Sequence, residues 1–238
     1  MWLAIDTATD RASVALGTSA ADAVDETLGG ARRHAASLLP MVAALLRRRN
    51  ARLEDVRGVA LSDGPGSFTG LRVGASVAKA LVQTRELPLW TAPSLLVRAA
   101  GVAGDGRVVL AVANALRGEV YAAAYRFVSD RIETLLAPSV QRPEELMRTD
   151  LVPDLLVGEA PAEVAVPLEA WVGRPMVRPP EGAPQARWLI DLVGRPGGAE
   201  RVTAVQGWEP VYGRPAEAQA RWEAAHGRPL PDSVGGPR

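Results

Sequence analysis

The order of the expected strands near the start of the chain recurs in its second half. Three short apolar segments lie near the start, at about residues 2–6, 13–17 and 23–28, and three more lie at about 108–115, 120–127 and 131–136. Alternating helix-like and strand-like segments follow in each half. Such alternation is typical of α/β folds. Its recurrence predicts two similar α/β subdomains side by side.

The Gly-Asp-Gly sequence at 104–106 is a natural boundary between the halves, because glycine and aspartate favour turns. We therefore assign residues 1–103 to an N-terminal subdomain and residues 104–214 to a C-terminal one. Residues 215–238, rich in Gly, Pro and charged residues, are expected to form a tail that is partly loose.

The composition fits a packed globular protein and excludes several kinds of site. Apolar residues make up 47% of the chain and charged residues 23%, with no net charge, so a whole-chain electrostatic footprint for nucleic acid is missing. The absence of cysteine excludes disulfides, thiolate zinc sites and a cysteine nucleophile. We find no targeting segment and no run of 18 apolar residues, so we expect a cytoplasmic protein without a membrane partner.

Two helices are expected in the first half. Apolar residues with a 3.6-residue period predict one at about 34–49, which either starts near Ala36 or bends at Pro40. A buried strand at 56–62 leads through the glycine-rich stretch SDGPGSFTGLRVGAS (62–76) to a second helix at about 69–84.

The glycine-rich stretch matches neither common phosphate-binding motif. A Walker A loop needs a lysine directly after its second glycine, and the only lysine of this chain is Lys79. The glycine spacing also fails the Rossmann fingerprint. Two interpretations of Ser67 and Thr69 remain: they cap the helix, which the residues alone favour, or they help its free N–H groups to hold an anion.

Three further features are weak indications of a functional site. Asp6 ends a strand as in the first phosphate loop of actin-like kinases, but Ala8 stands where those kinases have glycine. His34 and His226 form no metal-binding pattern, so we expect no metal site. Arginines at 47–49, 52 and 57 are a local patch that could touch RNA phosphate, although cations also suit a helix C-terminus.

Small residues at Gly70, Gly74 and Ala78 lie four positions apart along the second helix. Because glycine inside a helix is costly, this ridge predicts the close approach of another backbone. The neighbour is expected to be the helix at 34–49, its copy in a second chain, or both.

Five blocks of sequence, in order across nearly the whole chain, resemble the TsaB family of tRNA threonylcarbamoyladenosine biosynthesis. They are IDTATDRASVAL (5–16), His34 with LLPMV (38–42), GPGSFTGLRVG (64–74), RGEVYAAAY (117–125) and EPVY (209–212). The resemblance implies a duplicated fold of the actin/hexokinase/Hsp70 type (ribonuclease H-like). It also implies a non-catalytic dimerization subunit that activates TsaD, which modifies the adenosine beside the anticodon. TsaD carries an H-x-x-x-H metal motif that this chain lacks.

The resemblance further implies partners and contact residues. The helices at 34–49 and 69–84 would form a bundle with TsaD, or with a second copy of the chain when TsaD is absent, and the ATPase TsaE would join the assembly. The expected partner interface comprises His34, Leu38, Val42, Leu45, Leu71, Gly74, Ala75 and Ala78. We expect no cofactor of its own, although a nucleotide is a candidate at the junction with TsaD. The candidate nucleotide or anion contacts are Asp6, Thr7, Ser67, Thr69 and Asn114.

Two other function classes have less support in the sequence. An ATP-binding kinase or ATPase of the same fold is opposed by Ala8 and by the lack of a placed lysine. A metallopeptidase is opposed by the absence of zinc ligands and of a Ser-His pair. The family's usual aspartate before the RGEVY segment is Asn114 here, which puts any charge-dependent role of that position in doubt.

Overall fold

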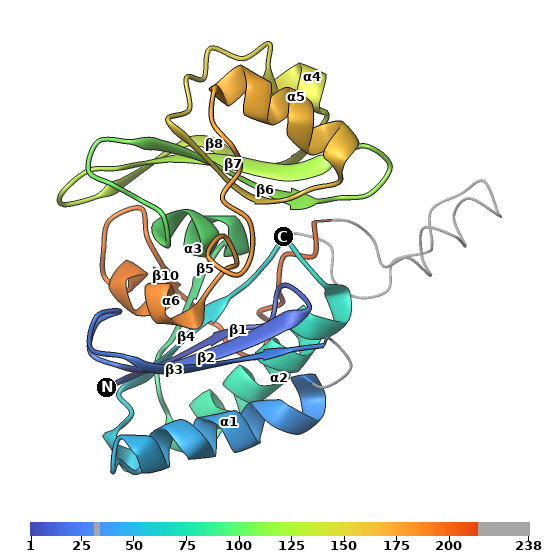
Figure 1. Cartoon of the computed structure of the whole chain (residues 1–238). Helices are drawn as coiled ribbons and strands as arrows, with labels where there is room; N and C mark the ends of the chain where they lie inside the picture. Colours follow the sequence, from blue (N-terminus) through green and yellow to red (C-terminus); the bar gives the residue numbers. More distant parts are fainter. Residues whose placement is uncertain (31–33, 214–238) are drawn as a thin grey trace, which may run out of the picture.

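Two β-sheets form the frame of the molecule, which the computed structural model describes for residues 1–30 and 34–213 (Figure 1). The first sheet has the order β10-β5-β4-β1-β2-β3 and the second has the order β8-β7-β6-β9. The strands of the first sheet are β1 (Trp2–Asp6), β2 (Arg11–Gly17), β3 (Val24–Gly29), β4 (Gly58–Ser62), β5 (Leu89–Ala92) and β10 (Glu200–Arg201). Those of the second are β6 (Val108–Asn114), β7 (Val120–Phe127), β8 (Ile132–Gln141) and β9 (Leu155–Glu159). The expected tail, residues 215–238, lies outside the described residues.

The two sheets repeat one pairing scheme. β1 is antiparallel to β2, β2 is antiparallel to β3, and β1 is parallel to β4. In the same way, β6 is antiparallel to β7, β7 is antiparallel to β8, and β6 is parallel to β9. The duplication expected from the order of the strands is therefore confirmed.

The helices and sheets stack in five layers (Figure 1). α1 and α2 cover the outer face of the first sheet, α3 and α6 lie between the sheets, and α4 and α5 cover the outer face of the second. The helices are α1 (His34–Arg48), α2 (Phe68–Arg85), α3 (Ser94–Ala100), α4 (Pro143–Leu146), α5 (Ala162–Val172) and α6 (Ala186–Leu192), with a short 3-10 helix at Leu53–Asp55. None of the helices in the described part of the chain is long and apolar enough to cross a membrane.

Alternation along the strands supplies three hydrophobic cores. In β1, Leu3 and Ile5 pack with the core under α1 and α2, whereas Ala4 belongs to the core between the sheets. In β6, Val109 faces the middle core and Leu110 faces α5. Successive side chains of a strand point to opposite faces, so each sheet serves two cores. The last residue of β1 that points to the middle layer is a charged one, Asp6.

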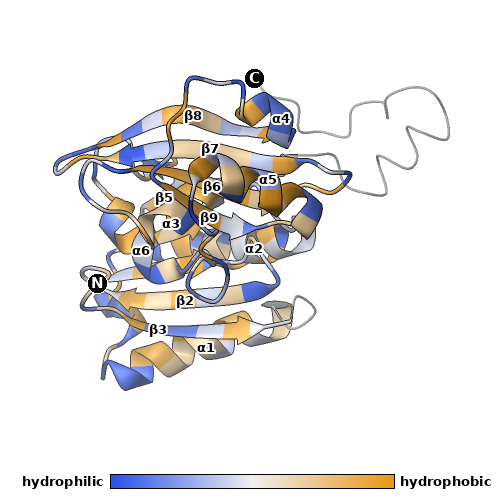
Figure 2. Cartoon of the chain, turned by 45° about the horizontal axis from the view of Figure 1, so that its top comes forward, coloured by the Kyte–Doolittle hydropathy of each residue, from blue (hydrophilic) through white to orange (hydrophobic). Residues whose placement is uncertain are grey.

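α1 begins at His34, two residues before Ala36, and Pro40 lies inside the helix. Pro40 is exposed, and the Ala36 carbonyl that loses its helical partner there is on an exposed residue too. Leu38 and Leu45 are fully buried, which stabilises the fold by about 2 kcal/mol each. Figure 2 shows the hydrophilic C-terminal end of α1.

The chain returns to the first sheet near its end. α6 packs against β1, β2 and β4, and β10 pairs antiparallel with β5. Residues 186–201 therefore lie with the first sheet, whereas the sequence grouped them with residues 104–214. The physical reason is that α6 fills the space between the sheets, where its apolar side chains Leu189 and Ile190 are buried.

Candidate functional site

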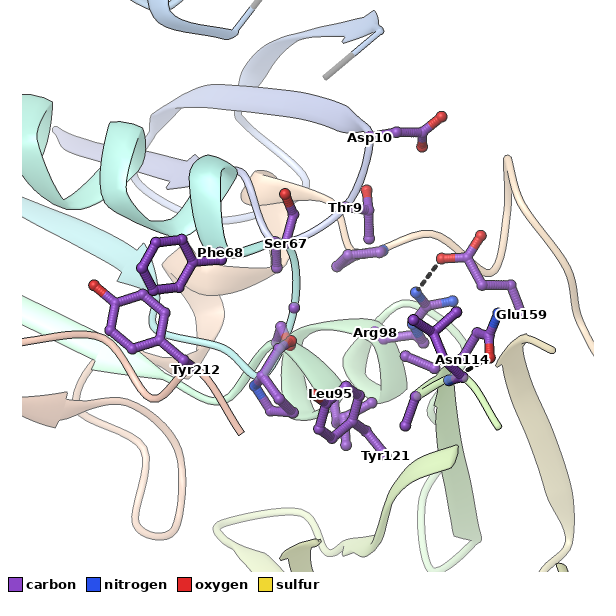
Figure 3. Close-up of a pocket in the computed structure, with 18 of the residues that line it drawn as sticks. Thr9, Asp10, Ser67, Phe68, Leu95, Arg98, Asn114, Tyr121, Glu159 and Tyr212 are labelled. Carbon is purple, nitrogen blue, oxygen red and sulfur yellow. Dashed lines mark hydrogen bonds and ion pairs between the residues drawn. The ribbon is translucent and has the colours of Figure 1, made fainter. Parts of the chain in front are cut away.

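A cleft of about 840 Å³ opens between the two subdomains (Figure 3). One wall consists of the β1–β2 connection, the β4–α2 loop and part of α3. The other consists of the β6–β7 hairpin with the single residues Glu159, Pro184 and Tyr212. This volume lies in the range of small-molecule sites.

The glycine-rich loop is closed against the chain's own backbone. The Ser67 N–H donates to the Ala8 carbonyl over 2.7 Å, and a Cβ on Gly66 would lie only 2.2 Å from that oxygen. The Gly70 N–H donates to the Ser67 hydroxyl over 3.2 Å, so Ser67 is the N-cap of α2. Of the two interpretations of Ser67, helix capping and anion binding, the structure shows helix capping. Thr69 is exposed in the first turn and does not line the cleft.

The C-terminal segment holds this loop from the other side. The Val211 N–H donates to the Asp63 carbonyl over 2.7 Å. The rings of Phe68 and Tyr212 pack 4.6 Å apart, and the Arg72 guanidinium lies 4.6 Å from the centroid of the Phe68 ring. These contacts place an aromatic pair at one end of the cleft (Figure 3).

Asp6 and Thr7 lie beneath the cleft and are fully buried. One Asp6 oxygen accepts a hydrogen bond from the Ala8 N–H over 3.1 Å. Its other oxygen and the Thr7 hydroxyl have no hydrogen-bond partner among the described residues. Burial raises the pKa of Asp6 to about 6, although the Ser62 hydroxyl, the Ala8 N–H and the Arg98 charge each lower it. This carboxyl is therefore not available at the cleft surface to meet a ligand.

Arg98 is a candidate site residue that was not predicted from the sequence. It lies on α3, is only 2% exposed and lines the cleft. Its Nη1 donates to the Gly182 carbonyl over 2.7 Å and its Nη2 to Glu159 Oε1 over 3.1 Å. Burial lowers the pKa of Arg98, and Glu159 opposes that shift. An arginine inside the apolar helical run SLLVRAA is the signal that could have found it.

The β6–β7 hairpin forms the opposite rim in an unusual backbone conformation. Leu116, Arg117 and Gly118 all have positive φ, at 64°, 56° and 75°. The Asn114 side-chain oxygen supports the turn by accepting from the Leu116 N–H over 2.9 Å. Left-handed conformations are costly for residues other than glycine. The hairpin holds Leu116, 64% exposed, at the rim of the cleft.

The expected partner-interface residues lie inside the chain instead of on its surface, except His34, whose side chain lies outside the described residues. Most of them pack between α1, α2 and the first sheet, and Leu71 lies beside Gly64: Leu38, Val42, Leu45, Leu71, Gly74, Ala75 and Ala78 are all buried. The periodicity located the apolar face of each helix correctly, but this face covers the chain's own sheet. In the single chain these seven residues are therefore not exposed for contact with a partner.

The glycine ridge of α2 also has an internal neighbour. A Cβ on Gly70 would lie 2.1 Å from the Thr7 carbonyl oxygen, and one on Gly74 would lie 2.3 Å from the Thr7 hydroxyl. At Gly70 and Gly74 the close approach expected for this ridge is made by the β1–β2 connection, whereas Ala78 shares a core with residues of α1, the helix expected as the neighbour.

The arginines after α1 are largely engaged with the chain itself. Arg48 donates to the Asp25 carbonyl over 3.1 Å, and Arg49 pairs with Asp22. Arg57 lies over the Trp2 ring at 5.0 Å. Within residues 1–30 and 34–213, no group of three His, Cys, Asp or Glu side chains could hold a metal ion.

Comparison with known proteins places this architecture in a family. The model of the TsaD family, tRNA N6-adenosine threonylcarbamoyltransferase, matches residues 24–169. The tRNA threonylcarbamoyladenosine biosynthesis protein TsaB of Buchnera aphidicola is 30% identical over 155 residues, which cover 64% of this chain and 70% of that protein. The chain belongs to the TsaB branch of this family. The Escherichia coli TsaB protein is 36% identical over 151 residues, 58% of this chain and 63% of that protein.

Solved structures agree with the TsaB assignment. YeaZ from Pseudomonas aeruginosa is 28% identical and superposes with a TM-score of 0.66, covering 81% of this chain and 90% of that one. The duplicated α/β fold of the actin type expected from the resemblance to TsaB is confirmed. The residues matched by the family model include α1, α2, Arg98 and the β6–β7 hairpin, and so carry most of both walls of the cleft.

Proposed function

We propose that this chain is the partner-binding subunit of a tRNA threonylcarbamoyladenosine assembly, which binds and activates a TsaD-type transferase. Membership of the TsaB family supports this role. The surface that fits it best is the solvent side of α1 and α2, which lies at the outer end of the stack of layers (Figure 1). The observation that carries the proposal is an apolar strip on that side.

The strip, which we call the outer α1–α2 face, differs from the residues expected from the sequence. It comprises Ala36, Leu39, Pro40 and Ala43 of α1 with Val73 and Val77 of α2, all exposed or partly buried. Leu39 is 54% exposed and is one of the few large apolar side chains left at the surface of the described residues. A helical pair that keeps an apolar strip facing solvent is suited to bundle with helices of another chain.

Exchange of a single side chain tests this surface. Leu39→Glu would place a charge in the centre of the outer α1–α2 face and is expected to weaken binding to a TsaD-type protein at least about tenfold, because burying an unpaired charge is costly. Val166→Glu on α5 is the matched control, since Val166 is also an exposed apolar residue of a helix, at 60% exposure. Equal affinity of both variants for the TsaD-type protein would contradict the proposed surface.

Activation would work through differential affinity. If the outer α1–α2 face binds one TsaD conformation better than another, the population of that conformation increases. The shift in the equilibrium between the two conformations cannot exceed the difference in their binding free energies. We propose that the same face joins two copies of the chain when the transferase is absent, and that a TsaE-type ATPase joins the assembly. One surface for both partners predicts that they compete.

We propose that the chain does not itself catalyse the transfer. Its two histidines are 192 positions apart, at His34 and His226, and lack the H-x-x-x-H pattern that the resemblance ascribes to TsaD. A kinase or ATPase activity is not supported either, because Asp6 is fully buried and the Ser67 N–H already donates a hydrogen bond to the Ala8 carbonyl. Purified protein is expected to show no transferase activity until a TsaD-type protein is added.

A further inference from the structure

The cleft has two chemically different ends (Figure 3). At one end lie the paired rings of Phe68 and Tyr212. At the other end, Arg98 and Glu159 meet beside Asn114, and Leu95 and Tyr121 lie between the ends. A small ligand bound at the second end would meet charged groups at that end and apolar side chains beside them.

The polar end is built into the fold. The Arg98 side chain is 2% exposed, whereas its partner Glu159 is 44% exposed. A guanidinium has five N–H donors, and the described residues accept two bonds from this one, at Gly182 and Glu159. Arg98 therefore keeps donor capacity where it lines the cleft, with a partly exposed carboxylate next to it.

A polyphosphate does not fit this arrangement. The carboxylates of Asp10, Glu119 and Glu159 line the cleft, against the cations Arg98 and Arg117. The Ser67 and Gly70 N–H groups at the start of α2 already have partners inside the chain. Arg142 also lies 3.7 Å from Glu119, so negative and positive charges around the cleft are balanced, and the lining has no surplus of positive charge for a polyphosphate.

A guanidinium and a carboxylate side by side complement a ligand that carries an anion and a cation on neighbouring atoms. The head of a free α-amino acid has this form: its carboxylate pairs with an arginine in a charge-assisted contact, and its ammonium pairs with a glutamate. Asn114 supplies a third contact, because its oxygen accepts from the Leu116 N–H and its amide nitrogen has no bond to the described residues.

The apolar residues that line the cleft determine which kind of side chain such a ligand can carry. Leu95 and Tyr121 are almost fully buried and line the cleft next to the polar end. Leu116 lies at the rim, 64% exposed, on a backbone held in the left-handed region. Backbone strain of this kind concentrates at ligand-binding sites, where an apolar side chain held outward can close over a ligand.

We propose that the cleft binds a free α-amino acid with an aromatic side chain, with the carboxylate on Arg98, the ammonium on Glu159 and the ring against Leu95, Tyr121 and Leu116. This site is separate from the outer α1–α2 face, and its test does not depend on a partner protein.

Ligand-observed NMR titrations of the full chain provide the test. The probes are L-phenylalanine, N-acetyl-L-phenylalanine, which lacks the ammonium, L-phenylalaninamide, which lacks the carboxylate, and ATP. L-phenylalanine is expected to bind with a Kd of about 1 mM or tighter, as its size allows. Each blocked derivative should bind about tenfold more weakly, because it loses one charged contact. Equal affinity for the blocked and free forms, no binding of L-phenylalanine, or preferential binding of ATP would each overturn the proposal.

A variant separates the ammonium contact from general effects on folding. Glu159→Gln is expected to abolish the difference between L-phenylalanine and its N-acetyl derivative, while Glu163→Gln, an exposed glutamate of α5, should keep it. A difference that survives in folded Glu159→Gln protein contradicts the assignment of the ammonium. If that variant does not fold, the comparison of derivatives on the unaltered protein still decides the proposal.

Discussion

The Arg98 guanidinium of α3 lies 3.1 Å from the Glu159 carboxylate at the end of β9, and so joins the two subdomains across the base of the cleft. The same arginine binds the Gly182 carbonyl in the connection that leads back to the first sheet. One buried cation thus links three segments that are far apart in sequence. Its removal should be felt by the whole fold.

Arg98→Met is expected to lower the free energy of unfolding by about 3 kcal/mol, because it leaves the Gly182 carbonyl and Glu159 without their partner. Arg117→Met is the matched control. Arg117 is exposed on the hairpin, so its loss should change stability by no more than about 0.5 kcal/mol. Urea unfolding of both variants measures the difference, and similar midpoints would show that the Arg98 contacts contribute little.

Asp6 predicts how stability depends on pH. Burial raises its pKa from 3.8 to about 6, so the folded state holds this proton more tightly than the unfolded state. Stability is therefore lost as the pH rises through this interval, by up to about 3 kcal/mol from this group. Asp6→Asn removes the titration, so its stability relative to the unaltered protein should increase between about pH 4 and pH 6. A constant difference in the free energy of unfolding would disprove the shift.

Gly70→Ala tests the contact between α2 and the β1–β2 connection. The new Cβ would lie 2.1 Å from the Thr7 carbonyl oxygen. This oxygen belongs to the backbone and so cannot easily move away. We expect a net loss of about 1 to 3 kcal/mol in spite of the gain of about 1 kcal/mol in helix propensity. Gly29→Ala, where a Cβ meets nothing within 4 Å, should be nearly neutral. Thermal melts distinguish the two, and a stabilised Gly70→Ala protein would contradict the packing.

Ala78→Trp tests whether the inner face of α2 belongs to the core. Ala78 is fully buried, so a tryptophan there should destabilise the monomer by about 3 kcal/mol or more. Ala80 is exposed two residues further along, and Ala80→Trp should leave the monomer folded. Circular dichroism of each purified variant is the measurement. A folded Ala78→Trp monomer that fails only in partner binding would instead indicate that this face contacts the partner.

Much of the fold could be predicted from short-range patterns. The 3.6-residue period located α1 and α2 within about two residues of each end, and the recurring order of strands predicted the duplication. The period identifies an apolar face but not the element that covers it. Leu38 and Ala78 were therefore assigned to a partner, although they cover the chain's own sheet.

The cleft was harder to predict because its key contacts are long-range. Arg98 and Glu159 lie 61 positions apart, and no local motif joins them. The return of α6 and β10 to the first sheet is also decided by packing between the sheets and not by local sequence. Several segments that line the cleft carry a local signal and were recognised in advance: the glycine-rich loop by its turn residues, and the connection after Asp6, Asn114 and Tyr212 through the blocks shared with the TsaB family.

Size-exclusion chromatography with light scattering on this protein, alone and mixed with the TsaD-type protein of the same organism, measures whether the two proteins bind. We expect a one-to-one complex in the mixture and the loss of any homodimer, because both species would use the outer α1–α2 face. Separate elution of the two proteins, with the transferase shown to be folded, would disprove the proposed partner-binding role.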